Sequence, residues 1–230
     1  MVRGMHGPSW NQAMKIFDQL REEHVVIERV VGALQTFAAL RLGGAGEAAD
    51  GLGFIGFFRL FADRHHHALE EGVLFPAIAR AVEVPLERGP LAALEGDHRS
   101  MKALMDALAP HLRGDSRGAA RLVELAARYG AALLHHIDAE NYVLFEECER
   151  RLPRAGVLEL ETRPAGPEAL SARAAGERLA AAYPPSEIAG IFRGEGCVLC
   201  PNYGAGCDGI EREWWSELEW EDALERMGSS

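Results

Sequence analysis

The chain has 230 residues, of which 48% are hydrophobic and 26% are charged, and its formal net charge is -11. This length and balance fit one folded domain, or one domain with an appendage, and exclude a disordered chain. The acidic excess argues against DNA and anionic membranes as partners. The sequence shows neither a long uninterrupted apolar segment nor a leader pattern, so we expect a cytoplasmic location.

Helical periodicity dominates the first two thirds of the chain. Apolar residues recur at three and four steps, and alternating β-branched runs are nearly absent. Four long helices are therefore expected, at about residues 10–42, 54–84, 91–112 and 117–151. Gly- and Pro-containing turns separate them, and Pro76 is expected to kink the second. The pattern predicts an all-α protein, an up-down-up-down antiparallel four-helix bundle over residues 11–152.

The composition changes beyond Pro153, where Ala, Gly, Pro and Glu prevail. We treat residues 153–230 as a C-terminal extension of short helices and a Cys-rich loop at 194–209. One helix is expected near residues 167–182, and an acidic, Trp-bearing stretch at 211–227 could form a last amphipathic helix.

A repeat of metal-ligand residue types relates the first helix pair to the second. Both halves read His, a gap of about 40 residues, and then His-x3-Glu-x3-Leu-Phe. A histidine and a glutamate four residues apart share one helix face, so both can reach one point in a bundle core. The residues in these positions are His24, His66 and Glu70 in the first half and His98, His136 and Glu140 in the second.

Four imidazoles and two carboxylates form a ligand set for two metal ions. The glutamates are the natural bridges, because a carboxylate has two oxygens, and each histidine would be a terminal ligand. Six protein ligands leave open positions for oxygen, nitric oxide, peroxide or a bridging oxo group. Burying these groups without a metal would cost roughly 1–3 kcal/mol for each unpaired group.

Three consecutive histidines, 65–67, could each be the ligand of the second helix, and comparison of the two halves of the repeat decides between them. Only His66 with Glu70 reproduces both the spacing of His136 with Glu140 and the distance to Leu-Phe. The remaining histidines are expected to be ordinary surface or core residues. They are His6, His65, His67, His111 and His135.

Four motifs, one on each expected helix, resemble a known family. They are Glu23-His24, His66-x3-Glu70 with Leu74-Phe75-Pro76, Asp97-His98, and His136-x3-Glu140 with Leu144-Phe145. Over about residues 11–152 the chain resembles the hemerythrin-like, or HHE cation-binding, family, whose members are four-helix bundles with a non-haem di-iron site. The resemblance implies two iron ions, oxo- or hydroxo-bridged, held by the six residues of the repeat.

The chain departs from the oxygen-carrying hemerythrins at two positions. Their third helix supplies two histidines four residues apart, whereas Lys102 lies four residues after His98, and Glu140 replaces a more distant Asp. The four-His, two-Glu set looks more like the branch with nitric-oxide-responsive proteins, iron-sulfur cluster repair proteins and iron or oxygen sensors. Because paired cysteines typical of the repair proteins are missing ahead of Met14, cluster repair is only an alternative.

The Cys-rich loop is the second candidate site. Cys197, Cys200 and Cys207 lie within eleven residues, flanked by glycines that permit tight turns. They could hold zinc, iron or a cluster, act as a redox dithiol, or be inert thiols. A four-ligand site would need a further donor, which could be Cys148 folded back from the fourth helix, Asp208 or a solvent ligand.

The sequence favours a di-iron protein that binds oxygen, nitric oxide or peroxide for sensing, storage or detoxification. One alternative is a di-iron oxidoreductase that reduces nitric oxide or peroxide or assists cluster repair, with a partner or electron donor acting through the tail. Another is an iron- or oxygen-responsive regulatory module. We expect an apolar ligand pocket lined by Phe17, Ile27, Phe58, Met101, Leu133 and Ile137.

Overall fold

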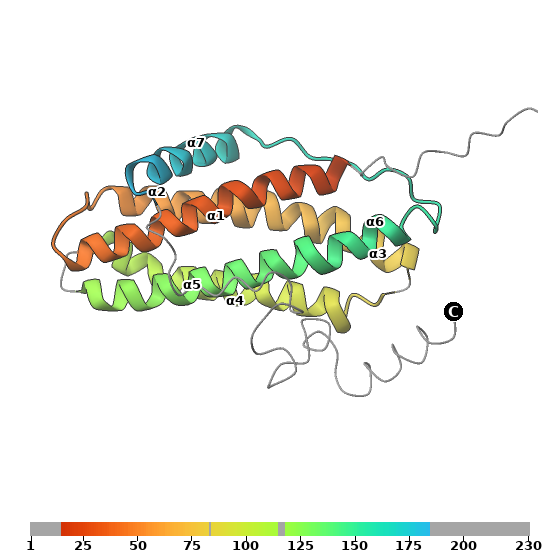
Figure 1. Cartoon of the computed structure of the whole chain (residues 1–230), viewed down its shortest axis with the longest axis horizontal. Coiled ribbons are helices and arrows are strands. Elements are labelled where there is room, and N and C mark those ends of the chain that lie inside the picture. Colours follow the sequence, from red (N-terminus) through yellow and green to blue (C-terminus); the bar gives the residue numbers. More distant parts are fainter. Residues whose placement is uncertain (1–14, 83, 115–117, 185–230) are drawn as a thin grey trace, which may run out of the picture.

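The computed structural model describes residues 15–82, 84–114 and 118–184, and this part of the chain is helical with no strand (Figure 1). The expectation of an all-helical bundle is confirmed. None of the described helices is long and apolar enough to cross a membrane. The elements are α1 (Lys15–Leu42), α2 (Asp50–Gly56), η1 (Phe57–His67), η2 (Glu70–Leu74), α3 (Phe75–Val82), α4 (Gly89–Arg113), α5 (Ala119–Ala139), η4 (Glu140–Leu144), α6 (Phe145–Arg151) and α7 (Pro167–Ala182).

Four rods make the body of the molecule. Helix α1 is the first and α4 the third, while the second runs without a break from α2 to α3 and the fourth from α5 to α6. Helix α5 packs against α1 and α4, and the second rod packs against both α1 and α4. The rods lie side by side, so side chains from all four can meet at the centre (Figure 1).

The buried apolar side chains form two clusters along the rods. One includes Val30, Phe37, Phe54, Leu108 and Leu125, and the other includes Phe17, Leu20, Phe75, Leu94 and Phe145. On α1 the second cluster ends at Leu20 and the first begins at Val26, so His24 lies between them. The clusters therefore leave room for a polar layer in the middle of the bundle.

Wide π-helical turns interrupt the second and fourth rods at matching places. Segment η2 begins at Glu70 and η4 begins at Glu140, and each ends immediately before the Phe of the repeat. Pro76 follows the first of these turns, but Glu146 stands at the matching place in the fourth rod. Proline is therefore not the common cause. Such turns are frequent at functional sites, and here each begins at a predicted ligand.

Helix α7 lies on the outside of the bundle, against α1 and η1 (Figure 1). Its bounds are those expected from the sequence. Gly176 permits close contact, because a Cβ at this position would lie 2.2 Å from Cδ2 of the buried Phe57. The Arg173 guanidinium lies 5.8 Å from the ring centroid of Phe61. Helix α7 thus packs directly on the π-helical segment that ends at His67.

We expect Gly176→Ala to lower the free energy of unfolding by about 1–2 kcal/mol, because the new methyl group must displace the Phe57 ring. Gly56→Ala is the matched control. No atom of the described residues lies within 4 Å of a Cβ there and the backbone is helical, so this substitution should raise stability by about 0.4–1 kcal/mol. Urea unfolding of the two variants would measure the difference, and equal effects would contradict the close packing of α7.

Candidate metal centre

The six predicted ligands come together in the polar layer between the apolar clusters. All are at most 4% exposed. They lie in two overlapping groups whose potential ligand atoms are within 4.8 Å of one another. The groups are His24, His66, Glu70 and Glu140, and His67, Glu70, His98 and His136.

Glu70 faces both groups, one oxygen toward each. Its Oε1 lies 3.3 Å from Nε2 of His66, and its Oε2 lies 3.4 Å from Nε2 of His98. Glu140 has a related position, with Oε2 3.3 Å from Nε2 of His24 and 3.4 Å from Nε2 of His136. Each carboxylate is therefore placed between histidines of different groups, as a bridge between two metals requires.

The histidine pairs have the geometry of neighbouring ligands on one metal. Nε2 of His98 and Nε2 of His136 are 3.0 Å apart, and two nitrogens at about 2.1 Å from one metal and at right angles would be about 3.0 Å apart. The ring centroids are 4.6 Å apart in the pair His24 and His66 and also in the pair His98 and His136. Both pairs meet edge to face, so their Nε2 atoms can converge.

Buried atoms without hydrogen-bond partners mark the centre of the layer. Both oxygens of Glu70, both oxygens of Glu140 and Nε2 of His24 make no hydrogen bond within the described part of the chain. Buried carboxylate oxygens normally have partners, since an unpaired buried charge is costly. Two cations between these oxygens would supply the missing partners, so the residues present fit a dinuclear metal centre.

A ring of neighbouring polar residues orients the histidines. His66 Nδ1 donates to Glu23 Oε2 at 2.9 Å, and His98 Nδ1 donates to Glu71 Oε1 at 2.7 Å. Such hydrogen bonds fix the tautomer and turn Nε2 toward a metal.

His24 is oriented by a hydrogen bond too, whereas His136 Nδ1 makes no hydrogen bond within the described residues and has a carboxylate near it. His24 Nδ1 donates to Asn141 Oδ1 at 2.9 Å, and Asp97 Oδ2 lies 3.5 Å from His136 Nδ1. Each helix rod thus carries a ligand histidine and also a polar group for the ligand of another rod. These contacts form a closed ring, because the first rod contacts a histidine of the second, the second one of the third, the third one of the fourth, and the fourth one of the first.

The phenylalanines of the repeat pack on ligand histidines of other rods. Phe145 stacks on His24 with ring centroids 5.7 Å apart, and Phe75 stacks on His98 at 6.0 Å. These contacts give the Leu-Phe part of the sequence repeat a physical role. It restricts the ring orientation of the histidine contributed by a neighbouring helix.

Histidines of the polar layer favour the charged form of Glu140. Burial raises the pKa of Glu140, but attraction to His136 and His24 outweighs it and brings the pKa to about 2. Burial lowers the pKa of His98, but attraction to the Glu70 carboxylate and the hydrogen bond to Glu71 outweigh it and raise the pKa to about 10. Attraction between these carboxylates and His98 thus offsets part of the cost of burying the layer.

Three residues near the ligands were not identified from the sequence. Glu71 and Asn141 each follow a predicted glutamate ligand, and this shared adjacency was an available signal. His67, expected to be ordinary, is buried beside His98, with ring centroids 3.9 Å apart and nearly parallel planes. Burial lowers its pKa well below the usual range, and the neighbouring histidines lower it further.

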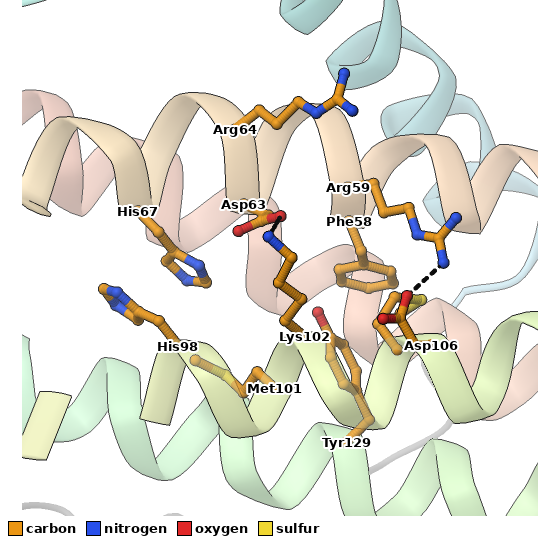
Figure 2. A pocket seen from close by; sticks show the side chains of 11 residues that line it. Phe58, Arg59, Asp63, Arg64, His67, His98, Met101, Lys102, Asp106 and Tyr129 are labelled. Atoms are coloured by element: carbon orange, nitrogen blue, oxygen red, sulfur yellow. Dashed lines mark hydrogen bonds and ion pairs between the residues drawn. The ribbon is translucent and has the colours of Figure 1, made fainter. Parts of the chain in front are cut away.

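A cavity of about 310 Å³ reaches the layer between η1 and α4 (Figure 2). His67 and His98 lie at one end of it. Phe58 and Met101 line it as expected, but Phe17, Ile27, Leu133 and Ile137 are not among its lining residues. Its wall also contains two ion pairs, Lys102 with Asp63 and Arg59 with Asp106. The expected apolar pocket is thus partly charged.

The cysteines of the second candidate site divide between described and undescribed parts of the chain. Cys197, Cys200 and Cys207 lie outside the described residues. Cys148 is buried in the second apolar cluster, and burial raises the pKa of its thiol to about 12. Because thiolates rather than thiols bind metals, Cys148 is poorly placed to complete a metal site.

The chain was compared with known proteins. Neither the curated proteins nor the solved structures include a match. The family model described as the hemerythrin HHE cation binding domain matches residues 15–148, which is more than half of the chain and contains all six predicted ligands. On this match the protein belongs to the hemerythrin HHE cation-binding domain family.

Proposed function

We propose that the protein is a non-haem di-iron protein that binds a small ligand, oxygen, nitric oxide or peroxide, for sensing, storage or detoxification. The observation that carries the proposal is the pair Glu70 and Glu140. Their four oxygens are buried between two pairs of imidazoles and have no hydrogen-bond partner among the residues that the structure describes. This arrangement supports two metals that share bridging carboxylates, within four rods for which we infer the antiparallel up-down order.

Two iron ions held here would supply open coordination positions and a change of oxidation state. The protein's residues supply the rest. Glu70 and Glu140 would bridge, and His24, His66, His98 and His136 would be terminal ligands. The apolar clusters on both sides exclude water, so the charges of the centre are weakly screened.

Lys102 supports a four-His set rather than that of the oxygen carriers. Its ammonium lies 3.6 Å from the Asp63 carboxylate, and its side chain is 65% exposed. A lysine directed to solvent and to an aspartate does not replace a buried histidine ligand. Reversible oxygen carriage with the ligand set of the carriers is therefore not part of this proposal.

The charged cavity favours a second candidate, an oxidoreductase that reduces peroxide or nitric oxide. Polar side chains along the route to the site suit a hydrogen-bonding substrate better than a purely apolar gas. This alternative needs electrons, and a donor or partner protein acting through the C-terminal tail is the corresponding proposal. Cluster repair and a regulatory role are further alternatives. Binding of zinc or iron at the tail cysteines is a proposal of the same standing.

Removal of either bridge should empty the site. We expect Glu70→Ala and Glu140→Ala to reduce bound iron from about two to less than one ion per chain, because each variant loses a group shared by both metals. Iron content after anaerobic reconstitution would be measured by elemental analysis. Glu146→Ala, on the same rod as Glu140 but at an exposed position, is the matched control and should retain both ions.

Iron affinity should fall as the pH falls from 8 to 6. The pKa of His98 is raised to about 10, so its protonated form predominates throughout this range and one proton must leave when the metal binds. Each pH unit should change the affinity about tenfold. Competition with a chelator would measure it, and a constant affinity over the range would argue against His98 as a ligand.

Binding and turnover can be separated with the reduced, iron-loaded protein. A stoichiometric and reversible optical change on exposure to oxygen or nitric oxide, with no product, is the result expected for a binding protein. Many equivalents of peroxide or nitric oxide consumed per chain would instead establish the oxidoreductase. Protein prepared without iron is the control for both measurements.

A further inference from the structure

His67 is a buried polar residue beside the centre that the six-ligand set leaves without a role. It is 4% exposed, and its Nδ1 has no hydrogen-bond partner within the described residues. One of its ring nitrogens lies within 4.8 Å of ligand atoms of Glu70, His98 and His136. Its ring also forms part of the cavity wall, where Figure 2 shows it facing His98.

The stacked position of His67 argues against a role as a third histidine ligand of the same metal. Its ring centroid is 3.9 Å from that of His98, and the planes differ by 11°. The lone pair of an imidazole lies in the ring plane, so a bound metal lies close to that plane. Two stacked, nearly parallel planes have no common point near the rings. His98 and His136 meet instead at 71° and can share a metal.

The cavity distinguishes the two halves of the centre. His98 lies on its wall, whereas neither His24 nor His66 lines it. His24 is covered by Phe145, which stacks on its ring. A small molecule that arrives through the cavity therefore reaches the metal position of His98 and His136 first, and it passes His67.

We propose that His67 is a hydrogen-bonding residue for an external ligand bound at the metal position of His98 and His136. The inference rests on the proposed di-iron function and specifies the ligand class: a small oxygen or nitrogen ligand with a hydrogen-bond acceptor, such as peroxide or azide. A neutral imidazole has one N–H donor, which could hold such an acceptor in place. The π-helical turn of η1 brings His66 and His67 inward together, so one rod supplies both a metal ligand and this donor.

The test uses azide as the probe on oxidised, iron-loaded protein. His67→Phe keeps an aromatic ring beside His98 but removes the donor, whereas His67→Gln keeps an N–H donor. Met105→Leu, also on the cavity wall, is the control for a change of shape without a change in hydrogen bonding. Iron content, azide affinity and the azide dissociation rate are measured for each variant.

We expect His67→Phe to retain about two iron ions and to bind azide roughly tenfold more weakly, with faster dissociation, because one hydrogen bond is lost. His67→Gln and Met105→Leu should stay within about threefold of the unmodified protein. Loss of iron in His67→Phe would make His67 a metal ligand and overturn the inference. Unchanged azide binding with full iron content would also overturn it. If the unmodified protein itself held fewer than two irons, the di-iron function would fail first, and this inference with it.

Discussion

The rest of the structure depends on two carboxylates at the centre of a helical bundle that have no hydrogen-bond partner in the described part of the chain. Glu70 and Glu140 are completely buried, and the groups nearest to their oxygens are imidazoles. Burial of unpaired charge is among the most costly arrangements in a protein. It becomes favourable when cations take the place of water around the carboxylates, which links the stability of this layer to metal binding.

The internal repeat explains why a single sequence can build this layer from two similar halves. In each half a glutamate begins a π-helical turn, and the phenylalanine directly after that turn packs on a histidine of another rod. The halves differ in the segment that precedes the glutamate in the sequence. The second rod has a long π-helical segment, η1, that places His65, His66 and His67 inside, whereas α5 is an ordinary helix. The cavity opens beside this less regular half.

Much of the architecture was predictable because helical periodicity and ligand spacing are local properties of the sequence. The helix at residues 167–182 has the expected bounds, and the repeat selected the six side chains that meet. The π-helical turns were not predictable, since they change the position of side chains without changing the order of apolar residues. The burial of His67 follows from such a turn. The charged cavity wall also escaped prediction, because its ion pairs join residues 39 and 47 positions apart.

The closed ring of orienting residues has a consequence for how the helices are assembled. Each rod gives one polar contact to a neighbour's histidine and receives one from another neighbour. If one rod slid by a single turn, about 5.4 Å, both its outgoing and its incoming contacts would break together. A shifted rod therefore misaligns two histidines, its own and the one that it orients on a neighbouring rod. The ring therefore links the register of each rod to two neighbours, so that misalignment of one rod costs two contacts at once.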